Sequence, residues 1–299
     1  MKILLCGANG QLGIEIQSIL KNGFSDLGTL SYVYQEAELV CADVEELDIT
    51  NEKAVLEFII TGTFDLIINC AAMTNVDGCE KYEEVAYRVN ALGALYLARA
   101  ADATGAKLLQ ISTDYVFSGE EAKEYLETDA AEPQSAYGRT KLAGEELVLG
   151  ACKSSFVVRT AWLFGAQGPN FVKTIIELAL QNGEITVVDD QYGNPTYAHD
   201  LAYELLQIAE TDEYGIYHCT NKGICSWFEF ASKIVDIAGI PCKKTPCKTE
   251  QFPRPAKRPT YSPLRNKRLE DTIGDKMREW PDALATYLSR TKLWEMVEQ

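Results

Sequence analysis

Three glycines near the start of the chain restrict its fold more than any other feature. They are Gly7, Gly10 and Gly13, and they directly follow a short apolar run at residues 2–6. Glycines at this spacing between a strand and a helix allow a tight turn, close approach of a pyrophosphate to the backbone, and close packing of the helix on the strand. The phosphates of a ligand then lie at the positive N-terminus of the helix. The loop therefore predicts a dinucleotide site, and a purely structural turn is the alternative.

The first half of the chain alternates short apolar runs with longer amphipathic ones. The short runs suit buried parallel strands and cover residues 2–6, 39–43, 64–70, 107–113 and 155–160. They are separated by helical patterns, each long enough for a crossover, near 12–22, 51–61, 80–104 and 137–150. This alternation predicts an α/β fold of the Rossmann type, a doubly wound parallel sheet with helices on both faces. Residues 23–38 interrupt the pattern and predict a loop or an extra turn.

The pattern becomes less regular from about residue 165. Strand patterns near 185–188 and 214–219 alternate there with helical patterns near 170–181, 198–210 and 226–238, and a last helix is expected from Pro281 to about residue 297. We expect residues 1–165 to form a dinucleotide-binding domain. Residues 166–299 should form mainly a smaller substrate-binding lobe, interleaved with the first domain because some of its segments return to it.

Charge and cysteine usage exclude several classes of partner. The chain has 28 Lys+Arg against 44 Asp+Glu, a formal net charge of −16, which repels nucleic acids and anionic membranes. No apolar run approaches the roughly 20 residues of a membrane-spanning helix. The nine cysteines form no C-x-x-C pair, and there are only two histidines, so neither a disulfide framework nor a zinc site is expected. We expect a cytoplasmic protein that binds no nucleic acid and no membrane.

One segment departs from this acidic composition. Residues 243–268 hold nine basic residues and a single acid, Glu250. A positive segment on an acidic protein suits a small anionic ligand at close range. A solvated loop is the alternative.

Two groups of residues predict acid–base chemistry beside a nicotinamide. Thr113 ends the fourth predicted strand, while Tyr137 and Lys141 are four residues apart and share one face of a predicted helix. A free phenol has a pKa of about 10, and lowering it to about 7 takes roughly 4 kcal/mol. A neighbouring ammonium, together with the positive nicotinamide of an oxidised coenzyme, supplies such stabilisation. Thr113 is placed to orient the same substrate oxygen. A surface Tyr/Lys pair is the alternative interpretation.

Other residues at the expected strand ends are candidates for the coenzyme, because ligands bind outside the carboxyl ends of parallel strands. Asp43 closes the second strand, where an acid binds the adenosine ribose hydroxyls and opposes a 2′-phosphate; a loop acid without this role is the alternative. Residues 69–74 end the third strand with small side chains that let a coenzyme lie close to the backbone. Packing alone also explains those alanines.

Longer motifs carry a resemblance to a known family. The spacing of the glycine loop is similar to that of short-chain dehydrogenases/reductases. The sequences STDYVFSG, YGRTKLAGE, DDQYGNPT and RPTYSPLRNKRLE resemble the dTDP-4-dehydrorhamnose reductase family within that superfamily, and the resemblance runs in order from about residue 1 to 296. The phenylalanine of STDYVF differs from sugar-nucleotide epimerases and dehydratases, which usually carry an acidic residue after the Ser/Thr-Asp.

The resemblance implies reduction of the 4-keto group of dTDP-4-dehydro-L-rhamnose with NADPH or NADH. Tyr137 then protonates the C4 oxygen, and Lys141 lowers the pKa of the phenol and holds the nicotinamide ribose. Thr113 and Asp114 contact the sugar. Asp48 and Ile49 fall where the family binds the edge of the adenine. Trp162 resembles an aromatic wall beside the sugar or the nicotinamide. Arg258 is expected to meet the phosphates of the substrate. The alternative for Trp162 is packing between the lobes.

The candidate residues divide into three sets. The catalytic candidates are Thr113, Tyr137 and Lys141. The candidates for the coenzyme are Gly7, Gly10, Gln11, Leu12, Gly13, Asp43, Asp48, Ile49, Ala71, Ala72, Thr74, Tyr137 and Lys141. The candidates for the dTDP-sugar are Thr113, Asp114, Trp162 and Arg258.

Departures from the family and competing hypotheses leave some points open. The stretch 23–38 is longer than usual, which leaves the choice between NADPH and NADH open. Some family members bind Mg²⁺ through glutamates at a dimer interface. Glu15 stands in one such position, but no partner acids accompany it in the sequence, so we expect no essential metal. A homodimer is possible. An epimerase or dehydratase and a non-catalytic regulatory subunit are the alternatives. Residues 115–117 argue against the first, and retention of Thr113, Tyr137 and Lys141 against the second.

Overall fold

A six-stranded parallel sheet forms the centre of the protein, seen here in a computed structural model that describes residues 1–293. Every neighbouring pair of strands in it is parallel. In spatial order the strands are β12 (Gly215–His218), β7 (Ser155–Thr160), β6 (Lys107–Thr113), β5 (Leu66–Asn69), β1 (Lys2–Cys6) and β4 (Glu38–Ala42). The expectation of a Rossmann-type α/β fold is confirmed.

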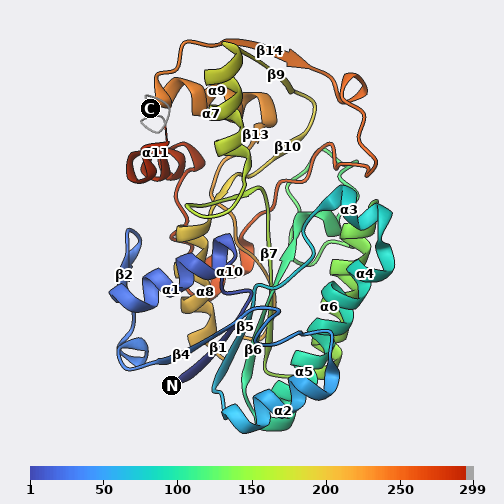
Figure 1. Cartoon of the computed structure of the whole chain (residues 1–299), viewed down its shortest axis with the longest axis vertical. Coiled ribbons are helices and arrows are strands. Elements are labelled where there is room, and N and C mark those ends of the chain that lie inside the picture. The colour runs from blue at the N-terminus through green and yellow to red at the C-terminus, as the bar shows by residue number, and fades with distance from the viewer. Residues whose placement is uncertain (294–299) are drawn as a thin grey trace.

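Helices cover both faces of this sheet (Figure 1). One face packs against α1 (Gln11–Asn22) and α8 (Ala198–Glu210), the other against α2 (Glu52–Gly62), α5 (Ala94–Thr104) and α6 (Ala136–Ala151). The side chains of β1 alternate between the two layers: Ile3 and Leu5 join the first core, while Leu4 joins the second. Continuous apolar strands are therefore buried on both sides, as a parallel sheet requires.

The predicted helix at 80–104 is wrong as a single element. The chain forms α3 (Val76–Lys81), α4 (Glu83–Tyr87), a π-helical turn at Arg88–Gly93, and only then α5. The break after α3 comes at Tyr82, whose backbone is not helical. In the π turn the backbone oxygen of Asn90 approaches α6 so closely that a Cβ on Gly144 would lie 2.2 Å from it. The π turn thus packs closely against Gly144 of α6, and the spacing of apolar residues in the sequence does not reveal such a turn.

The interruption at residues 23–38 is a short hairpin followed by a 3₁₀ turn. The hairpin pairs β2 (Phe24–Ser25) with β3 (Gly28–Thr29), and the turn covers Tyr32–Tyr34. Tyr34 is buried and donates its hydroxyl to the backbone oxygen of Leu206 at 2.7 Å. This contact fixes the segment to α8.

A second lobe lies beyond one end of the sheet, at the top of Figure 1. Its core lies among α7 (Phe171–Asn182), α9 (Trp227–Ala238) and α11 (Trp280–Thr291), beside the parallel pair β9 (Glu184–Val188) and β14 (Lys243–Cys247). Two short pairs complete the strands: β8 (Leu163–Phe164) with β11 (Thr196–Tyr197), and β10 (Tyr192–Gly193) with β13 (Cys225–Ser226).

The second half of the chain also contributes to the central sheet and its layers. β12 is an edge strand of the sheet, α8 covers one face, and α10 (Lys267–Thr272) packs against β12. The exact division near residue 165 stays a prediction. The last helix ends at Thr291, and the part of its predicted range at 294–297 lies outside the described residues. Within residues 1–293, no helix is both long and apolar enough to cross a membrane.

Candidate active site

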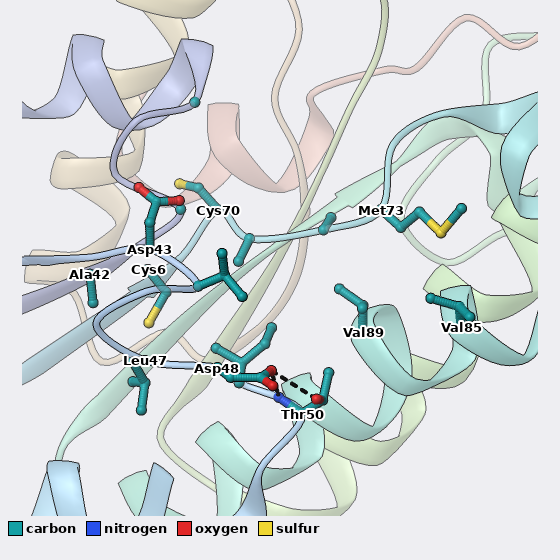
Figure 2. Close-up of a pocket in the computed structure, with 16 residues that line it drawn as sticks. Cys6, Ala42, Asp43, Leu47, Asp48, Thr50, Cys70, Met73, Val85 and Val89 are labelled. Carbon is teal, nitrogen blue, oxygen red and sulfur yellow. Dashed lines mark hydrogen bonds between the residues drawn. The ribbon is translucent and has the colours of Figure 1, made fainter. Parts of the chain in front are cut away.

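Two hollows at the carboxyl ends of the strands join into one crevice. Their volumes are about 460 and 450 Å³, and Gly10, Cys70 and Ala72 line both. The first hollow lies between the glycine loop and the turn after β4 (Figure 2). The second lies between the glycine loop, the end of β6 and the start of α6. A ligand that fills both would extend across the sheet, as a dinucleotide does.

The glycine loop is shaped by close backbone contacts. Gly7 has a φ of 72°, and a Cβ there would lie 2.7 Å from the backbone nitrogen of Ala71. A Cβ on Gly13 would lie 2.5 Å from the backbone oxygen of Gly7. α1 begins at Gln11 with no side-chain cap and no acid in its first turn, so its first N–H groups remain available to an anion. The loop therefore fits a pyrophosphate.

Two carboxylates lie in the first hollow. Asp43 follows β4 and accepts a hydrogen bond from the backbone nitrogen of Asn9 at 2.8 Å. Asp48 accepts bonds from the backbone nitrogen and hydroxyl of Thr50 at 2.9 and 2.7 Å, which hold the pKa of Asp48 below its usual value. Figure 2 shows these groups in separate parts of the hollow, and the residues that line it include no Lys, Arg or His. Such acceptors suit hydroxyl groups of a ribose.

The loop after β5 contributes to both hollows. Ala71 and Ala72 line the first hollow, Ala72 and Thr74 line the second, and Ile49 lines the first. Asn90, from the π turn, accepts a hydrogen bond from the backbone nitrogen of Met73 at 2.8 Å and holds this loop. Sequence periodicity did not indicate this contact.

Tyr137 and Lys141 lie one turn apart on α6, and both line the second hollow with Gln11, Leu12 and Thr113. Burial raises the pKa of Tyr137, while a hydrogen bond with Thr113 acts in the opposite direction. Lys141 is 4% exposed and donates its Nζ to the backbone oxygen of Ile111 at 2.6 Å. Burial lowers the pKa of Lys141 to about 8.

The protein alone therefore does not show a shift of the phenol towards a pKa of about 7; that shift is expected with an oxidised coenzyme bound, and for such a complex it stays a prediction. The interior disfavours the phenolate because burial removes it from water, and the nearby Asp114 acts in the same direction, so the hydrogen bond with Thr113 does not reverse the shift. Tyr137 and Lys141 line the same hollow, and Tyr137 is a neutral phenol at neutral pH.

Thr113 and Asp114 form a buried hydrogen-bonded pair at the end of β6. The Thr113 hydroxyl donates to Asp114 Oδ1 at 3.0 Å and accepts from the backbone nitrogen of Tyr115 at 3.2 Å. Asp114 Oδ2 accepts from the hydroxyl of Ser262 at 2.6 Å. Burial raises the pKa of Asp114 to about 6. Ser262 comes from the second half of the chain and was not among the predicted residues.

Trp162 lies in the second hollow and stacks on a second tryptophan. The rings of Trp162 and Trp227 are 3.5 Å apart and 7° from parallel, and both line the hollow. Trp162 has a φ of 47°, a left-handed conformation that is unusual for a bulky residue. Trp227 opens α9, where Ser226 and Glu229 form a capping box. That capping pattern could predict the start of the helix but not that Trp227 reaches the crevice.

Sequence and structure comparisons identify the family. The family model described as RmlD substrate binding domain matches residues 1–293. A dTDP-4-dehydrorhamnose reductase of Mycobacterium tuberculosis is 40% identical over 295 residues, which cover 96% of this chain and 92% of that protein. The chain belongs to the dTDP-4-dehydrorhamnose reductase family.

Two solved structures of the family are similar over almost their whole length. A dTDP-4-dehydrorhamnose reductase of Clostridium acetobutylicum has a TM-score of 0.92 and 49% identity, covering 98% of this chain and 100% of that one. One of Bacillus anthracis, solved in complex with NADP, has a TM-score of 0.90 and 39% identity, covering 97% and 99%.

Arg258, expected to meet substrate phosphates in this family, lies outside the residues that line the two hollows. Both of its terminal nitrogens donate to the carboxylate of Asp77 at 2.9 and 3.0 Å. Asp77 thus neutralises the guanidinium in this structure, and a contact of Arg258 with the substrate phosphates stays a prediction. Other cations of 243–268 pair with acids in the same way, as in Lys244–Asp236, Lys257–Glu120, Arg265–Glu270 and Lys267–Asp271.

Glu15, the position linked to Mg²⁺ in some family members, pairs with a histidine. Its Oε2 lies 2.9 Å from Nδ1 of His199, and both side chains are buried. Among residues 1–293, no group of three or more His, Cys, Asp or Glu side chains is arranged to hold a metal ion.

Proposed function

We propose that this chain reduces the 4-keto group of dTDP-4-dehydro-L-rhamnose to give dTDP-L-rhamnose, using NADPH or NADH. Its class, an NAD(P)H-dependent oxidoreductase, follows from the family to which it belongs. The observation that carries the proposal is the position of Tyr137, Lys141 and Thr113 in one crevice with the glycine loop. The homodimer and the cytoplasmic location expected from the sequence stay predictions.

The residues of the crevice fit a dinucleotide from end to end. The N-terminus of α1 would hold the pyrophosphate, Asp43 the adenosine ribose, and Lys141 the ribose of the nicotinamide. Bound NAD(P)H supplies the hydride that reduces the ketone carbon.

Tyr137 would supply the proton. As hydride reaches the ketone, negative charge develops on the oxygen, which needs a proton from a neighbouring acid. Burial raises the pKa of Tyr137, so the phenol is fully protonated at neutral pH and begins as a donor. Once the proton has left, the ammonium of Lys141, one helical turn away, stabilises the phenolate. The raised pKa therefore suits reduction, in which the phenol must start protonated.

Thr113 would orient the ketone oxygen, but its hydroxyl has a single proton to donate. In the structure that proton goes to Asp114. When Asp114 is itself protonated, it can donate to Thr113, and the Thr113 proton becomes free for the ketone oxygen. The pKa of Asp114, about 6, brings this protonated form within reach near neutral pH.

The test is direct. The purified protein is given dTDP-4-dehydro-L-rhamnose with each reduced coenzyme, and the loss of nicotinamide absorbance is followed together with formation of the 4-hydroxy sugar. We expect turnover with at least one coenzyme, one coenzyme consumed per sugar reduced. Absence of turnover with both coenzymes would contradict the proposal and favour the regulatory subunit. Isomerisation of a sugar nucleotide without net use of coenzyme would favour the epimerase.

A further inference from the structure

A buried ion pair lies behind the two proposed catalytic residues of α6. Tyr137, Lys141 and Glu145 follow one another at four-residue intervals, so they form one stripe along the helix. Glu145 is joined to Arg159 of β7, with side-chain exposures of 2% and 3%. Arg159 Nε and Nη2 donate to the two carboxylate oxygens at 2.6–3.1 Å. The hydroxyl of Ser112 also donates to Glu145 Oε1.

Stability alone is a weak reason for such a pair. Removing two charges from water is costly, and apolar side chains of similar volume often replace a buried pair without loss of stability. Arg159 Nη1 is buried, and no hydrogen-bond partner is found for it among the described residues. The pair is therefore not fully satisfied, and its position beside Lys141 points to another use.

We propose that Glu145 is a positioning residue that keeps the Lys141 amine protonated and fixes it against the end of β6. The proposal rests on the proposed function, in which Lys141 acts as an ammonium. Both oxygens of Glu145 are occupied by Ser112 and Arg159. Glu145 therefore acts on Lys141 through its charge across the buried interior, where charges are weakly screened.

The charges around Lys141 support this assignment. Burial lowers the pKa of Lys141 to about 8, and Glu145 is the foremost group that opposes the shift. The thiols of Cys70 and Cys79 also face Lys141, but burial raises the pKa of each above its usual value. Tyr137 is neutral for the same reason. Of these four groups, Glu145 alone is a carboxylate held in an ion pair.

The same carboxylate ties α6 to β6 directly before Thr113. Lys141 donates to the backbone oxygen of Ile111, and the next residue, Ser112, donates its hydroxyl to Glu145. Two consecutive residues of β6 are thus held by two residues of α6 one turn apart. These two hydrogen bonds set the position of Thr113 relative to Tyr137.

The experiment follows the titration of Lys141 itself. Protein labelled with ¹³C-lysine is titrated by NMR, and the Lys141 resonance is assigned by its loss in Lys141→Met. We expect a midpoint near pH 8 in the unmodified protein and a fall of about one pH unit or more in Glu145→Gln. Glu146→Gln is the matched control, because Glu146 is the next residue of α6 and is exposed; its midpoint should not move. An unchanged midpoint in Glu145→Gln would overturn the proposal.

Two further variants separate charge from folding and from position. Glu145→Gln leaves the charge of Arg159 without a partner, so the double variant Glu145→Gln/Arg159→Gln is measured as well. The Lys141 midpoint should also fall in the double variant, and an unchanged midpoint would contradict the proposal. Ser112→Ala removes the hydroxyl tie and keeps both charges. It should leave the midpoint in place and lower kcat several-fold, whereas an unchanged kcat would remove the positioning role.

The rate profile distinguishes this proposal from the proposed function. The alkaline fall of kcat/KM should move to lower pH in Glu145→Gln together with the NMR midpoint. A shifted midpoint with an unshifted rate profile would support the role of Glu145 and contradict the role of the Lys141 ammonium in the reduction.

Discussion

The two halves of the crevice differ in the kinds of residue that form them. The half around Asp43 is shaped by glycines, small side chains and backbone contacts, and its lining includes no basic residue. The half around Tyr137 buries ionisable groups, and burial raises the pKa of Tyr137 and lowers that of Lys141 to about 8. Binding thus depends on backbone shape in one half, while reactivity depends on altered protonation in the other. Substitutions should separate the two properties.

Replacement of Tyr137 should show the sharpest separation. Tyr137→Phe removes the proton donor while keeping the ring, so we expect kcat to fall about 10³-fold with little change in coenzyme affinity. Steady-state rates and fluorescence titration with reduced coenzyme measure the two effects. Tyr32→Phe is the control, since Tyr32 is 80% exposed. A loss of coenzyme affinity as large as the loss of kcat would show that the two halves do not act separately.

The parts of the crevice that could be predicted from sequence are local patterns. The glycine loop and the Tyr137–Lys141 spacing each lie within a few residues of chain, so strand, turn and helix geometry determine which groups meet. The end of β6 is likewise marked by a buried apolar run that leads to Thr113. Their place in one crevice then follows from the topology of a parallel sheet.

The parts that could not be predicted depend on distant partners. Arg258 and Asp77 are 181 residues apart in sequence, and no local pattern indicates that they pair. The strand β14 has the sequence Lys-Lys-Thr-Pro-Cys, which lacks an apolar run, and it pairs with β9 outside the central sheet. The raised pKa of Tyr137 has a similar origin, since burial depends on every element packed around the phenol.

The preference for NADH or NADPH tests the half of the crevice around Asp43. A 2′-phosphate on the adenosine ribose would lie against the carboxylate of Asp43, with no basic residue lining the hollow, so we expect NADH to bind about tenfold more tightly than NADPH. Asp43→Asn should reduce this ratio. Dissociation constants for both coenzymes give the answer. Glu45→Gln, in the same turn and exposed, is the control for a change of net charge, and preference for NADPH in the unmodified protein would contradict the assignment.

The pair between Arg258 and Asp77 tests whether a contact outside the crevice affects the catalytic half. If the pair simply ties the 256–264 segment to α3, then Arg258→Gln and Asp77→Asn break the same contact. Both should raise KM for the sugar nucleotide by a similar factor of a few-fold, since exposed or partly exposed pairs contribute about 1 kcal/mol. If Arg258 binds the substrate phosphates, Asp77→Asn should free it and lower KM. Opposite effects of the two variants would therefore support the predicted contact of Arg258 with the substrate phosphates.

The smallest expected effect is a pH dependence of kcat that arises from Asp114, in the catalytic half of the crevice. Below pH 6, Asp114 is neutral and can donate to Thr113, which leaves the Thr113 proton for the ketone oxygen; above pH 6, the carboxylate takes that proton. We therefore expect kcat to fall a few-fold as pH rises through about 6. Asp114→Asn cannot lose a proton, and its amide can still bond Thr113 and Ser262, so its kcat should stay level between about pH 5 and 7. The same fall in both proteins would assign the titration to another group and leave Asp114 as a contact to the sugar alone.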